Sequence, residues 1–290
     1  MRLLINGVRL FVDFDGPEWV ADGPTLRQKP TLILLHGGPG ADHSIFKPHY
    51  AAALSDLCHI LYLDHRGNGR SDDGDPALWT LDQWADDLAT LCDVLDIAKP
   101  IVYGGSFGGF VAQAFATKYP DRLAGLILSN TTAKVDFPTI YNAFGHLVGP
   151  AAQAAAQNYW GNPTSDSRAT YGQICVPHYT QTAIEPDFWS RVLMKDPVAL
   201  HFNGPTNEMG RFDFRAALAK VTCPSLVISG DKDPIMPSAF SETITAALTH
   251  SDAAHHCLPN CGHLPEFDAP DTYFNLLRNF LQRIPSKDTK

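Results

Sequence analysis

The sequence predicts an α/β protein, in which a mostly parallel sheet of eight strands is flanked by helices and interrupted by a helical insertion. Three observations lead to this fold class. Short apolar runs alternate with helical stretches, which is typical of a parallel sheet covered on both faces. Segments rich in glycine and charged residues follow several of these runs. One long segment, residues 132–213, lacks strand candidates.

Composition and charge exclude several other classes of protein. With 290 residues, 44% of them hydrophobic, the chain can bury a full core. Its net charge of −9 and its scattered basic residues argue against nucleic-acid binding. No apolar run is long enough to cross a membrane, and the N-terminus lacks the features of a signal peptide, so we expect a cytoplasmic protein. The cysteines form no C-x-x-C pair and are expected to be free thiols: Cys58, Cys92, Cys175, Cys223, Cys257 and Cys261.

Strand candidates can be placed along the whole core. Asn6-Gly7 separates the runs Leu3 to Ile5 and Val8 to Val12, which predicts an antiparallel hairpin at the start of the sheet. Six further candidates are short apolar runs bounded by turn residues, the last weaker than the others: Leu32 to Leu35, Ile60 to Leu63, Ile101 to Tyr103, Leu126 to Leu128, Leu226 to Ile228 and His256 to Leu258.

Helices are predicted between these strands. Thr80 can cap the first turn of a helix, and Gln83, three residues later, can complete a capping box. A second helix is expected after Ser106 and a third over residues 271–281. Apolar residues in the first helix recur at spacings of three and four and form one face: Leu81, Trp84, Leu88, Leu91 and Leu95.

The segment 132–213 differs in composition from the rest of the chain, because it is rich in Ala, Gln, Tyr, Trp and Pro. A structureless loop of that length would be exceptional in a compact domain. We therefore expect a helical lid over a core formed by residues 1–131 and 214–290. The lid's aromatic side chains are expected to serve mainly in its own packing, while some could line an apolar pocket.

Chemically suggestive motifs follow the predicted strands. The carboxyl ends of parallel strands face one crevice, where ligands bind. GGSFGG matches G-x-S-x-G, in which a sharp strand-to-helix turn exposes the serine, here Ser106. Alone this pattern is weak, because similar turns serve packing or phosphate binding. Five motifs fall at the predicted strand ends: HGGPG (36–40), DHRGNGRSD (64–72), GGSFGG (104–109), GDKDP (230–234) and CGHLPEF (261–267).

A base and a carboxylate are available to activate the serine. A serine hydroxyl becomes a nucleophile when a base removes its proton and a carboxylate orients that base. Ser106, Asp233 and His263 occur in the order that such serine turns require. His263 lies in a turn that can aim its side chain inward. Other residues compete for the acid or the base role because they follow or belong to strand candidates: Asp64, Asp231, His255 and His256.

Backbone amides for an oxyanion hole are also predicted. The turn at the serine directs the amide of Phe107 toward the crevice, and HGGPG supplies further amides. Gly37 and Gly38 would let the chain approach a substrate closely.

Together these motifs resemble the α/β-hydrolase fold and, within it, the proline iminopeptidase-like subfamily. HGGPG is similar to that group's oxyanion loop, DHRGNGRSD to its D-x-R-G-x-G-x-S element, and GGSFGG to its nucleophile turn. The resemblance covers nearly the whole predicted core and implies neither a metal nor another cofactor. It implies Ser106 as nucleophile, Asp233 as acid and His263 as base, with Gly38 and Phe107 as oxyanion donors.

The lid adds one more match. Residues 201–208, HFNGPTNE, are similar to a segment whose glutamate binds the free amine of a substrate in family aminopeptidases. The resemblance implies Glu208 as a substrate-binding residue, although this chain carries an extra residue before it. An amine site usually contains a second carboxylate, and the lid offers Glu185 and Asp187 as candidates.

The sequence thus predicts a serine hydrolase that cleaves a small amide through an acyl-enzyme, as an aminopeptidase or amidase does. A carboxylesterase or lactonase is the alternative, and a ligand-binding protein with idle residues is an alternative of another class. The expected partner is a small molecule or short peptide, and neither nucleic acid nor a membrane is expected. Dehalogenase and epoxide hydrolase chemistry is disfavoured, because those relatives carry aspartate where this chain has Ser106.

Overall fold

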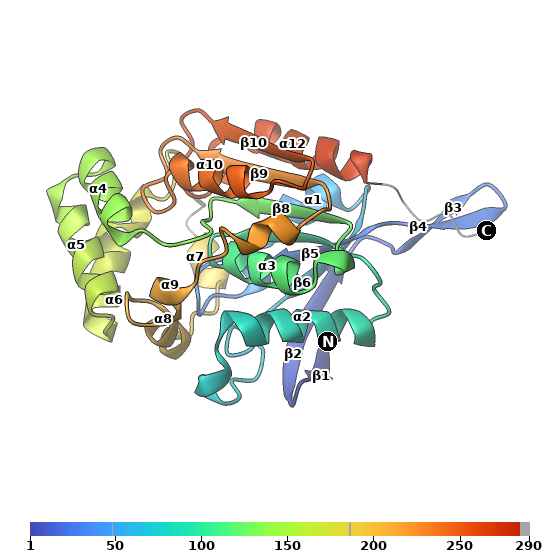
Figure 1. Cartoon of the computed structure of the whole chain (residues 1–290), viewed down its shortest axis with the longest axis horizontal. Coiled ribbons are helices and arrows are strands. Elements are labelled where there is room, and N and C mark those ends of the chain that lie inside the picture. Colours follow the sequence, from blue (N-terminus) through green and yellow to red (C-terminus); the bar gives the residue numbers. More distant parts are fainter. Residues whose placement is uncertain (48, 186, 285–290) are drawn as a thin grey trace.

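The computed structural model describes residues 1–47, 49–185 and 187–284, and its centre is an eight-stranded sheet (Figure 1). The pairs β1–β2 and β2–β6 are antiparallel, and the other neighbouring pairs are parallel. The predicted fold class is therefore confirmed. In spatial order the strands are β1 (Arg2–Ile5), β2 (Val8–Asp15), β6 (His59–Leu63), β5 (Thr31–Leu35), β7 (Ile101–Gly105), β8 (Gly125–Ser129), β9 (Ser225–Gly230) and β10 (Ala253–Leu258).

Two hairpins lie near the N-terminus. The predicted one joins β1 to β2, and both residues of its turn, Asn6 and Gly7, have positive φ angles of 44° and 83°, as a tight two-residue turn requires. The second hairpin, β3 (Trp19–Asp22) with β4 (Thr25–Gln28), was not predicted. It projects from the body of the molecule at the right of Figure 1.

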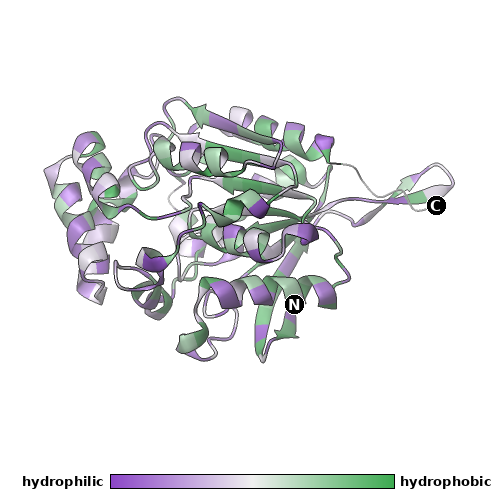
Figure 2. Ribbon diagram, viewed as in Figure 1, coloured by the Kyte–Doolittle hydropathy of each residue, from purple (hydrophilic) through white to green (hydrophobic). Residues whose placement is uncertain are grey.

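The core is divided between the two faces of the sheet. On β5 the side chains of Leu32 and Leu34 join one hydrophobic cluster, and those of Ile33 and Leu35 join the other. Figure 2 shows mostly apolar residues in the central strands and a mixture of polar and apolar residues in the helices. The helices that bury their apolar sides against one face are α2 (Leu81–Val94), α3 (Phe107–Lys118) and α10 (Ser238–Ala247); against the other lie α1 (His49–Leu54) and α12 (Pro270–Arg283).

The start of α2 differs from the predicted capping box. Thr80 Oγ1 accepts a hydrogen bond from the Gln83 backbone N–H at 3.2 Å, as expected of a cap. The Gln83 side chain, however, donates to Asp87 at 3.0 Å instead of returning to Thr80. The backbone N–H of Leu81 donates to Glu208 at 3.2 Å. A residue distant in sequence therefore completes the cap.

Helices also connect β8 to β9. Figure 1 places α4, α5 and α6 beyond one end of the sheet, where they pack against one another. Of the described residues between these two strands, none is in a β-strand. The helices are α4 (Phe137–Leu147), α5 (Pro150–Gly161), α6 (Ser165–Ile174), α7 (Phe188–Arg191), α8 (Asp196–Phe202) and α9 (Glu208–Arg211).

Two further sequence expectations concern the whole chain. All six cysteines are free thiols, and five of them are buried. Within the described part of the chain, no helix has the length and apolar character needed to span a bilayer. Residues 285–290, the end of the predicted second core part, lie outside the described residues.

Candidate active site

The turn between β7 and α3 holds Ser106 in a strained conformation. Its φ and ψ angles are 51° and −120°, which a residue with a side chain rarely adopts. Close backbone packing around the turn requires glycine at two positions. A Cβ on Gly104 would lie 2.3 Å from the Gly108 carbonyl oxygen, and one on Gly108 would lie 2.0 Å from that of Leu35. The glycines of the motif thus allow β7 and α3 to meet tightly enough to expose the serine.

His263 and Asp233 form a buried pair in the loops after β10 and β9. The Nδ1 atom of His263 lies 2.8 Å from Oδ2 of Asp233, whose side chain is inaccessible to solvent. Asp233 Oδ1 accepts hydrogen bonds from the backbone N–H groups of Ile235 and Met236 at 2.8 and 3.0 Å. Burial alone would raise the pKa of Asp233, but His263 and these hydrogen bonds hold it below its ordinary value. With Nδ1–H directed at Asp233, the Nε2 atom of His263 is available as a base.

The competing residues have other partners. Asp231 is exposed, and its nearest cation is Lys232 at 3.9 Å. His255 is hydrogen-bonded to Ser229 Oγ at 2.8 Å, and His256 lies in β10 as expected. Among the aspartates left open by the sequence, the structure therefore brings Asp233 to His263.

Three residues that the sequence analysis missed hold this pair in place. Asn130, which follows β8, donates from Nδ2 to Asp233 Oδ2 at 2.8 Å and to the Gly262 carbonyl at 3.0 Å. Asp268 accepts from the Gly262 N–H at 2.7 Å. The backbone carbonyl of Tyr179 accepts from the His263 N–H at 2.6 Å, and its ring packs edge-on against the imidazole at 5.3 Å. The sequence contains little indication of these residues. For Asn130 the one available sign was its position as a polar residue directly after a predicted strand.

Ser106 and His263 line one cavity of about 350 Å³ between the sheet and the connecting helices. The structure describes no hydrogen bond between the Ser106 hydroxyl and His263; such bonds often tighten only when substrate is bound. Most of the cavity wall is apolar or aromatic, as small-molecule sites usually are. Walls from α5, α6 and α7 include Tyr159, Trp160, Tyr171, Phe188 and Trp189.

The predicted oxyanion donors also line this cavity. Phe107 is the first residue of α3, so its N–H has no acceptor within the helix. Gly38 has a φ of 55°, a backbone conformation that favours glycine. The positive end of the α3 dipole adds to the attraction for a negative oxygen near Ser106.

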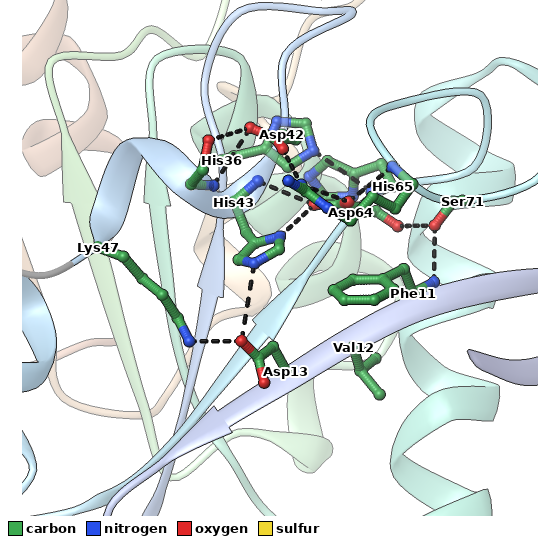
Figure 3. Close-up of polar contacts among 12 residues, drawn as sticks. Phe11, Val12, Asp13, His36, Asp42, His43, Lys47, Asp64, His65 and Ser71 are labelled. Carbon is green, nitrogen blue, oxygen red and sulfur yellow. Dashed lines mark hydrogen bonds and ion pairs between the residues drawn. The ribbon is translucent and has the colours of Figure 1, made fainter. Parts of the chain in front are cut away.

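Behind the HGGPG loop lies a buried network of charged residues (Figure 3). Asp64 accepts hydrogen bonds from the backbone N–H and the Nδ1 atom of His43 at 2.8 and 2.7 Å, and from the Arg70 N–H at 2.8 Å. Burial alone would raise the pKa of Asp64, but these donors hold it below its ordinary value. Figure 3 shows His43 between Asp64 and Asp13. Asp64 thus stabilises the loop, and it is not the carboxylate that is hydrogen-bonded to His263.

The same network contains the one group of described residues with metal-ligand spacing. Ligand atoms of Asp42, His43 and Asp64 lie within 4.8 Å of one another. The Arg70 guanidinium pairs with Asp42, and N–H donors occupy both oxygens of Asp64. His43 Nδ1 is directed at Asp64. The donor set fits a network of internal hydrogen bonds better than a bound cation.

Glu208, which the resemblance implied as a substrate-binding residue, is not among the residues that line the cavity. One oxygen of its carboxylate accepts from the Leu81 N–H at 3.2 Å, and the other is 3.4 Å from Arg211. Glu208 therefore caps α2. The candidates for a second carboxylate, Glu185 and Asp187, both face Arg191, at 3.2 and 3.9 Å, and neither lines the cavity.

A larger cavity of about 550 Å³ lies at the opposite end of the sheet, among residues that precede the strands. Lys29, Pro224 and Ile284 are among the residues that line it, and neither Ser106 nor His263 is. We therefore place the candidate chemistry in the smaller cavity, which combines the strained serine with a histidine–aspartate pair.

Comparison with known proteins agrees with this geometry. A family model described as alpha/beta hydrolase fold matches residues 30–270. The chain belongs to this family. Proline iminopeptidase PfmaB of Pestalotiopsis fici is 28% identical over 295 residues, with 96% of this chain and 98% of the relative covered.

Solved structures of α/β hydrolases extend the likeness to the whole chain. A thermophilic esterase from Thermogutta terrifontis has 25% identity and a TM-score of 0.69, with 98% of both chains covered. Proline iminopeptidase of Mycobacterium smegmatis shares the fold, with a TM-score of 0.76, 22% identity, and 98% of this chain and 97% of that chain covered. The predicted resemblance is thus confirmed, and the chain is a hydrolase of this fold.

Proposed function

We propose that this α/β hydrolase cleaves a small amide or ester through an acyl-enzyme formed on Ser106. One observation carries the proposal: the strained Ser106 shares a cavity with His263, and His263 is hydrogen-bonded to the buried Asp233. Nucleophile, base and orienting carboxylate are the three parts that acyl transfer needs.

The geometry supports a two-step mechanism. Ser106 Oγ attacks the carbonyl carbon while His263 Nε2 takes the serine proton, and Asp233 stabilises the imidazolium. The N–H groups of Gly38 and Phe107 bind the oxygen that becomes negative. The imidazolium then protonates the leaving group, and His263 activates water to hydrolyse the acyl-enzyme. The helices α4 to α9 would act as the lid that encloses the acyl group.

Two substrate classes fit this site. A small amide, for example the N-terminal residue of a peptide, is favoured by the HGGPG loop and by relatives named proline iminopeptidases. A carboxylic ester or lactone is favoured by the aromatic walls and by the position of Glu208 outside the cavity. In both cases Ser106 attacks the carbonyl, and only the leaving group differs.

A substrate panel tests the proposal and separates the two classes. Amino-acyl p-nitroanilides, their N-blocked forms and p-nitrophenyl acyl esters would be compared in the wild-type enzyme and in Ser106→Ala. We expect Ser106→Ala to lose hydrolysis by several orders of magnitude while it stays folded. An aminopeptidase would cleave the free-amine anilides and reject the blocked ones, whereas an esterase would prefer the esters. If Ser106→Ala retained most of the activity, the proposed mechanism would be wrong.

A further inference from the structure

Glu266 is an acidic residue in the active-site cavity that the proposed mechanism does not use. It lies in the short helix α11 (Pro265–Asp268), three residues after His263, and lines the same cavity as Ser106. Across the described residues, no side chain makes a hydrogen bond or an ion pair with its carboxylate; the donor near it is its own backbone N–H. Asp268, in the same helix, is instead fully engaged with backbone N–H groups of the loops around His263.

The surroundings of Glu266 leave its charge uncompensated. Burial raises the pKa of Glu266 to about 7, while its own N–H and His263 act in the opposite direction. The titratable groups that interact with it are one histidine, one carboxylate and a tyrosine cluster whose hydroxyls are hydrogen-bonded to one another at 2.7 to 3.0 Å: His263, Asp268, Tyr50, Tyr103 and Tyr273. A carboxylate in such a place is costly without a cation.

The other charges near the cavity are already paired. Arg168, on α6, lines the cavity but its guanidinium forms an ion pair with Asp196. Glu208 caps α2, outside the cavity. Among the described residues that line the cavity, Glu266 is the one carboxylate.

We propose that Glu266 is a substrate-binding residue that receives a positively charged nitrogen of the substrate, carried within a few atoms of the scissile carbonyl. The inference rests on the proposed function, because it concerns substrates that react at Ser106. Glu266 lies three residues after His263, lines the same cavity and interacts electrostatically with it, so the cation and the reacting carbonyl would lie close together. The paired cation would remain in an otherwise apolar cavity, where a charge–charge contact is strong.

Isosteric substrates test this assignment. The p-nitrophenyl ester of trimethylammonioacetate would be paired with that of 3,3-dimethylbutanoate, and the ester of 4-trimethylammoniobutanoate with that of 5,5-dimethylhexanoate. Within each pair only the positive charge differs, and the quaternary nitrogen does not titrate. Comparing each substrate between wild type and Glu266→Gln cancels its intrinsic reactivity.

In at least one pair, we expect Glu266→Gln to lower kcat/KM for the cationic ester by about tenfold or more, the scale of one lost charged contact. The neutral ester should change much less. The wild-type preference for the cationic ester should rise with pH through about 7 as Glu266 ionises, and this rise should be absent in the variant. Glu208→Gln, which alters a carboxylate outside the cavity, should keep the wild-type preference.

Failure of this inference can be told from failure of the proposed function. A fluorophosphonate probe that labels Ser106 in the wild type and in Glu266→Gln would show that both are folded and contain a reactive serine. If both label but Glu266→Gln changes the two members of each pair equally, or changes neither, the assignment of Glu266 is overturned. If Ser106 in the wild type is not labelled, the proposed function itself fails.

Discussion

Replacement of Glu266 by glutamine should remove a penalty on the stability of this hydrolase that grows with pH. Burial raises the pKa of Glu266 from an ordinary value of 4.5 to about 7 in the folded chain. Between these two values the unfolded chain releases the proton and the folded chain keeps it. The free energy of unfolding therefore falls as pH rises through this range. Above the range, where Glu266 is ionised in both states, the whole cost of burying its charge is subtracted from the stability of the folded chain. Glutamine is neutral throughout and does not incur this cost.

The size of the effect follows from the pKa difference. Each unit of difference corresponds to about 1.4 kcal/mol, which gives a penalty of at most about 3.5 kcal/mol above about pH 8. The value is an upper bound because Glu266 keeps partial access to solvent through the cavity. Relative to wild type, Glu266→Gln should thus gain stability progressively from about pH 5 to about pH 8.

Chemical denaturation over that pH range measures the effect as a difference in the free energy of unfolding. Glu242→Gln, on the exposed side of α10, is the matched control. A free-energy difference between wild type and Glu266→Gln that stays constant with pH would refute the reasoning. So would a gain in Glu242→Gln of equal size and the same pH dependence.

Three further predictions concern residues that shape the site. Gly108→Ala should prevent correct packing of the serine turn and abolish activity, because its Cβ would meet the Leu35 carbonyl at 2.0 Å; Gly161→Ala, where a Cβ meets nothing within 4 Å, should leave the melting temperature nearly unchanged. Asp87→Asn should lower the free energy of unfolding by about 3 to 5 kcal/mol, because it leaves the buried Arg66 guanidinium without its anion. Asp93→Asn, which alters an exposed ion pair, should lower it by less than about 1 kcal/mol. Unchanged stability in Asp87→Asn would contradict this. Glu208→Gln should lower stability by about 1 kcal/mol through the weakened α2 cap and leave KM unaltered, and a raised KM would return Glu208 to the substrate site.

Local patterns in the sequence were enough to predict the sheet and the position of its motifs. Continuous apolar runs such as Thr31–Leu35 are buried on both faces, and the Asn6-Gly7 turn fixes the first hairpin. Motifs placed at the carboxyl ends of parallel strands had to meet in one crevice, which brings Asp233 to His263. The order of the residues left Asp231 open as well, and the family resemblance favoured Asp233. The β3–β4 hairpin was also marked locally, by Gly23-Pro24, but its short and exposed strands lack an apolar pattern.

Contacts between distant segments could not be predicted in the same way. Gln83 has the spacing of a capping box, yet its side chain donates a hydrogen bond to Asp87. At the start of α2, the carboxylate of Glu208 accepts a hydrogen bond from the Leu81 N–H instead. The sequence places Glu208 in a lid motif, but its hydrogen bond with the Leu81 N–H at the start of α2 becomes evident only in the structure. Glu266 follows the CGH turn without a motif of its own, so its position in the cavity becomes evident only in three dimensions.

The most direct test of the central claim is the mass of the enzyme during turnover of a p-nitrophenyl ester. Rapid acid quenching followed by peptide mapping should find the acyl group on the peptide that contains Ser106, together with a burst of p-nitrophenol of about one equivalent per chain if deacylation is slow. Ser106→Ala should show neither. Sustained hydrolysis by the wild type with the acyl group on another residue, or an unchanged burst in Ser106→Ala, would contradict the acyl-enzyme mechanism.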